Sequence, residues 1–264
     1  MSEAQASPEI TGKMYLYEKP ELLMKEQHGD LAMKPAKQPF AFVSKARAVP
    51  ITLSEIPAAM KDYPLVFMSV EQPQLLAITG LFDDINLFVN EEGGWEDSRY
   101  IPGYVRRYPF GLAAETNGER MAIVIDRAFE GIAPDGEVAL FKDGEPTEET
   151  KAAIEYCKSY ERDRQMTDQF AQALKALDLI QPQTAQYTPQ GASEPVNFAQ
   201  YCSVDEKKLG ELSDDKVLEL YKNGTLPLVY ALLMSMSNWR HLLQRRARRF
   251  NLSEEDIFKP QTVN

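Results

Sequence analysis

Cysteine, histidine and long apolar runs are all scarce in this sequence of 264 residues. The two cysteines, Cys157 and Cys202, are too few for a disulfide framework, so a reducing compartment is the default expectation. With only His28 and His241, the chain has few imidazole groups for acid–base catalysis or metal binding. The longest apolar run, residues 226–236, is about half of the ~20 residues that a bilayer-spanning helix needs. We therefore expect no membrane span.

Targeting and catalytic motifs are missing as well. Residues 1–19 are polar and lack the apolar core of a secretory signal, so we expect a cytoplasmic protein, with surface export by a non-standard route left open. The sequence has no G-x-x-x-x-G-K-[ST] phosphate loop, no G-x-G-x-x-G after a strand and no G-x-S-x-G elbow. Nucleotide-binding and serine-hydrolase classes therefore lack their usual support, and we predict no cofactor.

Acidic residues outnumber basic residues, 40 to 29, and give a net charge of −11. A negative charge of this size disfavours binding along nucleic acid or an anionic membrane, although it leaves room for local basic patches. The hydrophobic content of 44% is that of a globular chain with a sizeable core. We expect a protein or peptide partner, and the composition indicates no particular oligomeric state.

Short apolar runs separated by turn residues dominate the first half of the chain. They predict strands at residues 40–43, 64–70, 75–79, 86–89, 110–114 and 120–125. Asn117-Gly118, between the last two runs, is the strongest hairpin signal in the chain. The runs between residues 64 and 89 predict an antiparallel meander.

At Thr147 the period of the apolar residues changes from two to 3.6. Helical spacing continues to Ile180, and Pro182 is expected to end this helix. A further hairpin and three helices are predicted at residues 183–202, 205–212, 213–222 and 226–250. The change of period predicts an α+β fold, with an antiparallel β-rich N-terminal part and a helical C-terminal part packed on it.

Three parts are expected along the chain. Residues 1–38 are polar and show no sustained period, which indicates a partly ordered N-terminal arm. Residues 39–250 are predicted to form one compact domain. Residues 251–264 are a polar tail.

Residues 100–110 (YIPGYVRRYPF) combine three tyrosines, two prolines and paired arginines. The prolines favour a bent connection, and Tyr and Arg are enriched where partners dock, so the segment is a candidate binding surface. Its candidate residues are Tyr100, Tyr104, Arg106, Arg107 and Tyr108. In the alternative interpretation, the aromatic residues fill the core and the arginines pair with carboxylates. Neighbouring side chains of an extended segment point to opposite faces, so we expect one arginine to be buried and the other exposed.

One basic cluster stands out in the last predicted helix. Its members are Arg240, His241, Arg245, Arg246, Arg248 and Arg249. Arg245, Arg248 and Arg249 share one helical face, which indicates a site for an anion or an acidic partner. In the alternative interpretation, they are solvated and interact favourably with the negative end of the helix dipole.

The two histidines allow one metal hypothesis. His28 and Asp30 have H-x-D spacing, and with His241 they make the two-histidine, one-carboxylate set of non-haem iron oxygenases. The alternative interpretation is that both histidines are ordinary surface residues.

The sequence resembles the bacterial SapC-like family over about residues 28 to 240, and most specifically in the YIPGYVRRYPF segment. The matching stretches are residues 40–42, 49–52, 55–59, 62–67, 86–89, 100–110, 143–147, 204–206 and 226–231. The family name comes from an association with a bacterial surface layer, and relatives often stand beside genes for outer-membrane nutrient receptors.

The resemblance implies an accessory role and brings no catalytic residues with it. The leading hypothesis is a non-enzymatic accessory or binding protein of a Gram-negative bacterium, linked to surface-layer or TonB-dependent outer-membrane uptake systems. The rival hypothesis is an enzyme that modifies a protein or a sugar, with metal-dependent oxygenation as its sharpest form.

Overall fold

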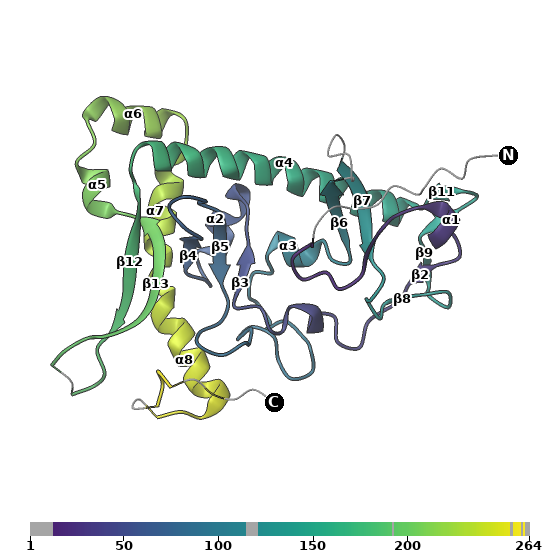
Figure 1. Ribbon diagram of the computed structural model, residues 1–264, viewed down its shortest axis with the longest axis horizontal. Coiled ribbons are helices and arrows are strands. Elements are labelled where there is room, and N and C mark those ends of the chain that lie inside the picture. The colour runs from purple at the N-terminus through teal and green to yellow at the C-terminus, as the bar shows by residue number, and fades with distance from the viewer. Residues whose placement is uncertain (1–12, 115–120, 192, 254–255, 260, 262–264) are drawn as a thin grey trace. The chain divides into compact units, whose positions relative to one another are not determined.

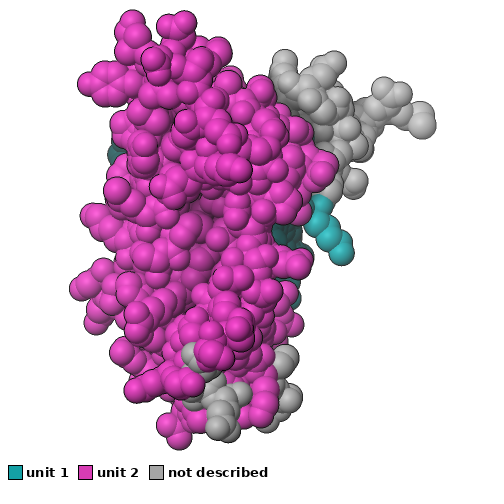
Figure 2. All heavy atoms as spheres, turned by 90° about the vertical axis from the view of Figure 1, so that its left-hand side faces the viewer, with its two compact units in different colours: residues 1–42, 106–162 teal, residues 43–105, 163–264 magenta. Residues whose placement is uncertain are grey.

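The computed structural model describes residues 13–114, 121–191, 193–253, 256–259 and 261 (Figure 1). The chain forms two compact units, and each of them is built from two separate stretches of sequence (Figure 2). The smaller unit takes residues 1–42 and 106–162, and the larger unit takes residues 43–105 and 163–264. All strand pairs between named strands are antiparallel in the described part, and the main helices follow residue 147, which confirms the α+β prediction. The division into arm, single domain and tail stays a prediction.

The smaller unit contains two three-stranded sheets and a two-stranded ribbon. The sheets have the orders β1(Pro20–Leu22)-β7(Met121–Asp126)-β6(Phe110–Ala114) and β8(Ile132–Ala133)-β2(Ala32–Met33)-β9(Val138–Ala139); the ribbon pairs β10(Phe141–Lys142) with β11(Glu145–Pro146). The pairing of β6 with β7 confirms the predicted hairpin, whose Asn117-Gly118 turn lies outside the described residues. A cluster that includes Phe110, Ile125 and Cys157 forms the core.

Part of the predicted N-terminal arm belongs to these sheets. It contributes β1, the short helix α1(Lys25–His28) and β2. The buried carboxylate of Asp126 accepts hydrogen bonds from the backbone N–H groups of Glu18 and Lys19, at 2.8 and 2.9 Å. A buried carboxylate needs such donors, so Asp126 holds the start of β1 beside β7.

The larger unit is organised around a five-stranded antiparallel sheet. Its order is β12(Ile180–Tyr187)-β13(Val196–Val204)-β4(Leu65–Phe67)-β5(Leu75–Ile78)-β3(Ala48–Pro50). The long β12–β13 pair confirms the predicted second hairpin. Pro182 lies within β12, an edge strand, where a missing N–H is tolerated.

Two of the predicted strands are absent. Residues 41–43 instead form the 3₁₀ helix η1(Ala41–Val43), and the backbone here makes local bonds such as Ala41 N–H to the Gln38 carbonyl. Residues 86–89 are mainly turn, since the buried Asn86 side chain accepts the Phe88 N–H at 3.0 Å. Only Val89 makes an isolated bridge, to Trp95. The prediction of a three-stranded meander is therefore wrong in its last strand.

The predicted helix after Thr147 is confirmed as α4(Glu148–Ala176), which passes from the smaller unit into the larger one along the chain. It ends before Pro182 because Asp178 adopts a left-handed conformation, with φ 57°. The short helices α5(Glu206–Gly210) and α6(Asp214–Lys222) also agree with the predictions. Two more short helices, η2(Leu53–Glu55) and α2(Ile56–Ala59), precede β4, and α3(Gly103–Arg106) follows β5. None of the helices in the described part of the chain is long and apolar enough to cross a bilayer.

The last predicted helix is two helices, α7(Thr225–Ser235) and α8(Asn238–Phe250). Polar side chains at the break bond outside the helical pattern. Ser235 Oγ accepts the Leu65 N–H at 3.0 Å, and Asn238 Nδ2 donates to the Met60 and Tyr63 carbonyls at 2.7 and 3.0 Å. Such side chains compete with helix continuation, so the break separates an apolar α7 from a basic α8.

Candidate functional site

A pocket of about 500 Å³ in the larger unit lies beside α8. Its lining residues are Lys61, Asp62, Leu87, Glu96, Arg99, His241, Gln244, Arg245, Arg248 and Arg249. Five of them are lysine or arginine and two are acidic, so the pocket is positive although the whole chain carries −11. A concave site with convergent polar groups is the usual form of a ligand site.

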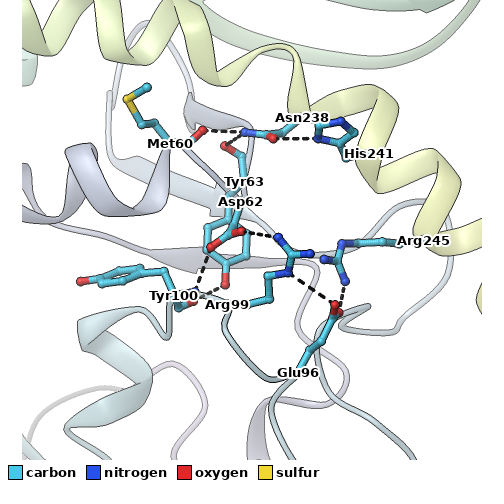
Figure 3. Close-up of polar contacts among 9 residues, drawn as sticks. All are labelled: Met60, Asp62, Tyr63, Glu96, Arg99, Tyr100, Asn238, His241 and Arg245. Carbon is cyan, nitrogen blue, oxygen red and sulfur yellow. Dashed lines mark hydrogen bonds and ion pairs between the residues drawn. The ribbon is translucent and has the colours of Figure 1, made fainter.

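Two of the pocket's arginines share one carboxylate. The Glu96 carboxylate accepts one hydrogen bond from the guanidinium of Arg245 and another, at 3.4 Å, from Arg99 Nε (Figure 3). Arg99 also donates to Asp62 at 3.0 Å. Arg245 lies over the Phe88 ring, 4.2 Å from its centroid, in a cation–π contact. Burial opposes ionisation of Glu96, but the hydrogen bonds and charges of Arg245 and Arg99 outweigh it and lower the pKa of Glu96.

The wall opposite α8 is held by a hydrogen-bond network. Asp62 accepts the Tyr100 N–H at 2.9 Å, and the Tyr63 hydroxyl donates to the Tyr100 carbonyl. Burial, followed by the charge of Asp62, raises the pKa of Tyr63, so its hydroxyl stays a donor. Asn238 ties the start of α8 to the residues before β4, and its amide oxygen lies 3.2 Å from His241 Nδ1 (Figure 3). These bonds fix the spacing of the two walls.

Two cations of the pocket remain available to a ligand. The side chains of Lys61 and Arg248 are exposed and make no hydrogen bond or ion pair with any residue that the structure describes. Within the described part of the chain, the Arg249 side chain pairs only with Glu91, at 3.8 Å, and the Glu91 side chain is 85% exposed. Exposed pairs of this length contribute little, so Arg249 is also easily recruited.

The arginines of the predicted basic face, Arg245, Arg248 and Arg249, all line this one pocket. Whether they bind an anion stays a prediction. Arg246, which belongs to the same cluster, is instead fully buried against Asp83, with contacts of 2.7 and 3.2 Å. It also donates to the carbonyls of Ile257 and Lys259, so its role is structural.

The family model SapC matches residues 23–242, which is most of the chain. The chain belongs to the SapC family. No curated protein and no solved structure matches it.

In this SapC chain, the predicted 100–110 surface is divided between the two units. Tyr100 and Tyr104 belong to the larger unit, where the Tyr100 hydroxyl donates to Glu55 at 3.0 Å and Tyr104 is buried. Residues 103–106 form the helix α3, so the bent connection contains a helical turn and is not extended there. The binding role of these tyrosines stays a prediction.

Arg106, Arg107 and Tyr108 belong to the smaller unit. Arg106 is exposed over the Tyr156 ring, whereas Arg107 is buried over the Tyr160 ring, 4.8 Å from its centroid. The expectation of one buried and one exposed arginine is therefore confirmed, but its reason was wrong, because Arg106 ends the helix α3 and the backbone is not extended there. Their role in binding stays a prediction.

Tyr108 and Cys157 show how closely this part of the smaller unit is packed. Tyr108 stacks on Phe42 at 3.7 Å between centroids and donates to Asp126 at 3.1 Å. Burial raises the pKa of the Cys157 thiol to about 11, and the charge of Arg107 offsets part of that rise.

The three residues of the metal hypothesis come from both units of the SapC chain. His28 is buried in the smaller unit, with Nδ1 bonded to Met24 and Nε2 at 3.5 Å from Glu21, while Asp30 is exposed. His241 lies in the larger unit, on the exposed side of α8. Within the described residues, no group of three or more His, Cys, Asp or Glu is arranged to hold a metal ion. The oxygenase hypothesis stays a prediction without structural support.

The sequence indicated the arginines that α8 contributes to the pocket but not most of the other lining residues. The missed residues are Lys61, Asp62, Leu87, Glu96, Arg99 and Gln244. The only local signal was the run of charges at residues 96–99, which lies next to the tyrosine-rich segment. Nothing in the sequence relates that run to a helix almost 150 residues away.

Proposed function

We propose that this SapC protein is a binding protein that takes the anionic groups of an acidic protein or peptide partner into the α8 pocket. The observation that carries the proposal is the presence of Lys61 and Arg248, both exposed and unpaired among the described residues, in one concave site. A cation without a partner in a pocket is available for a charge-assisted hydrogen bond to an incoming carboxylate.

The charge distribution supports recognition of a specific anion over general attraction of anions. The chain as a whole carries −11, while the pocket lining has five lysine or arginine side chains against two acidic ones. Long-range repulsion disfavours random contact with acidic molecules, and the pocket supplies the local attraction. Such an arrangement gives specificity and correct orientation more than raw affinity.

We further propose that this binding serves an accessory role in surface-layer or outer-membrane uptake systems. The support is membership of the SapC family, together with the absence from the sequence of the phosphate-loop and hydrolase motifs discussed above. In such a role the protein needs to hold a partner and does not need to transform it.

The test compares Arg248→Ala with Arg240→Ala. Both arginines are exposed on α8, but only Arg248 lines the pocket. Binding of a capped tetraglutamate peptide, measured by isothermal titration calorimetry, is expected to weaken about tenfold in Arg248→Ala, which corresponds to ~1.4 kcal/mol. Lys61→Ala is expected to act in the same direction, and Arg240→Ala is expected to leave binding nearly unchanged.

Recovery of a partner from extracts of the native host is the second part of the test. Wild-type protein is expected to retain an acidic protein that Arg248→Ala does not retain. Equal binding by wild type, Arg248→Ala and Arg240→Ala would contradict the proposal, as would a wild-type protein that binds neither peptide nor partner.

A further inference from the structure

The two carboxylates that line the α8 pocket differ in how firmly they are held. Asp62 has an 8% exposed side chain and accepts both Arg99 and the Tyr100 N–H. Glu96 has a 41% exposed side chain, and among the described residues this side chain bonds only the guanidinium groups of Arg99 and Arg245. Asp62 is therefore part of the wall, whereas Glu96 is open to exchange with solvent.

The backbone around Glu96 is well fixed, so its side chain can move by itself. The Glu96 N–H donates to the Phe88 carbonyl at 2.8 Å, and the preceding Trp95 bridges Val89. Asn90 closes the intervening turn by accepting the Glu92 and Gly94 N–H groups at 3.0 and 2.8 Å. Rotation of the Glu96 side chain into solvent breaks none of these bonds.

Arg245 is held by contacts other than its pairing with Glu96. Its side chain is 16% exposed and lies over the Phe88 ring. A largely desolvated guanidinium is costly without an anion, so some carboxylate has to occupy this position. In the structure that carboxylate is Glu96.

We propose that Glu96 is a built-in substitute for the ligand, and that a carboxylate of an acidic peptide displaces it from Arg245 when the pocket is filled. The inference rests on the proposed function and names its ligand as a peptide segment with several carboxylates. Arg99 and Arg245 each already hold a carboxylate, Asp62 and Glu96 respectively, and the planar guanidinium group suits a carboxylate ligand.

Exchange at Arg245 explains why several carboxylates are required. Replacing Glu96 by one ligand carboxylate conserves the ion pair and so yields little net free energy. The gain has to come from further carboxylates that reach Lys61 and Arg248, whose side chains have no partner among the described residues. A single acidic residue therefore binds weakly, and a run of neighbouring acidic residues binds well.

The decisive comparison is Glu96→Gln against Glu91→Gln. Both changes remove one negative charge from the same loop. Glu91 does not line the pocket, and among the described residues its carboxylate makes only a long contact, 3.8 Å between Glu91 Oε1 and the Arg249 guanidinium. Calorimetry with the capped tetraglutamate peptide is expected to show about tenfold tighter binding for Glu96→Gln, because the internal competitor is gone. Glu91→Gln is expected to change affinity less than twofold.

Displacement can also be observed directly in protein that keeps Glu96. Trp95 precedes Glu96, and Trp239 is the other tryptophan of the chain. In a Trp239→Phe background, the peptide is expected to change Trp95 fluorescence with the same midpoint as binding. Binding of the peptide with no change in Trp95 fluorescence would overturn the displacement, so the inference stays testable if Glu96→Gln fails to fold.

Each outcome separates this inference from the proposed function. If Glu96→Gln binds no tighter than Glu91→Gln while Arg248→Ala still weakens binding, the displacement is overturned and the anion pocket stands. If inorganic phosphate or a single capped glutamate binds as tightly as the peptide, the assignment to a multi-carboxylate segment is overturned. If wild type and Glu96→Gln both fail to bind the peptide, both proposals are overturned.

Discussion

Arg106 and Arg107 show how differently two neighbouring residues can be used. Arg107 is 7% exposed, and its guanidinium lies over the Tyr160 and Tyr17 rings, 4.8 and 5.8 Å from their centroids. Arg106 closes α3 and is exposed. Cation–π contacts of a desolvated guanidinium stabilise a fold far more than those of an exposed one. The difference lies in burial, since both side chains lie over tyrosine.

Arg107→Ala is therefore expected to lower the free energy of unfolding by about 2 kcal/mol or more, because the buried cation–π contacts and the packing of its stem are lost. Arg106→Ala is the matched control and is expected to change it by less than about 0.5 kcal/mol. Chemical denaturation of both variants provides the measurement. Equal stabilities would show that Arg107 has no structural role, and a loss of partner recovery by Arg106→Ala at unchanged stability would support the predicted 100–110 binding surface.

At the scale of elements, one carboxylate joins two helix starts in the larger unit. Glu55 Oε2 accepts the backbone N–H and the hydroxyl of Thr52, at 2.8 and 2.9 Å, in the capping box of η2. Glu55 Oε1 accepts the Tyr100 hydroxyl and the Gly103 N–H, at 3.0 and 2.5 Å, where α3 begins. The carboxylate accepts hydrogen bonds from N–H groups that have no partner within the helices. Its negative charge also interacts favourably with the positive end of each helix dipole.

Glu55→Gln tests this junction, because the amide nitrogen is a donor and faces donors on whichever side it lies. The substitution is expected to lower the free energy of unfolding by about 2–3 kcal/mol, since buried N–H or O–H groups lose their acceptor. Glu92→Gln, at an exposed position, is the control and is expected to have little effect. Thermal and chemical denaturation should agree on the order of the two variants. A Glu55→Gln protein as stable as the control would show that the junction contributes nothing.

At the scale of the whole molecule, both units depend on stretches that are distant in sequence. The larger unit takes residues 43–105 and 163–264, and its sheet places β4 from the first stretch beside β13 from the second, with Cys202 opposite Phe67. A cut near Glu145 leaves β3, β4 and β5 in one fragment and β12 and β13 in the other. It also separates α4 from most of the smaller unit.

Fragments 1–145 and 146–264 are therefore expected not to fold when each is produced alone, because each exposes a sheet edge and apolar surface that the other covers. Near-ultraviolet circular dichroism should show no fixed aromatic packing in either fragment and should recover when the two are mixed. The intact chain is the control. Two separately folded fragments would contradict this expectation and also the prediction of a single domain over residues 39–250.

The sequence by itself determined what neighbouring residues control: α4, the β6–β7 and β12–β13 hairpins, the basic face of α8 and membership of the SapC family. Periodicity and turn chemistry report interactions over a few residues, which is why these elements were predictable. The tertiary structure decided where those elements are interrupted and what they face. The break before Asn238 depends on carbonyls of Met60 and Tyr63, and Arg245 meets Glu96 across 149 positions of sequence. No local pattern encodes such distances, because pairing a charge or a buried amide with its partner depends on how the whole larger unit folds.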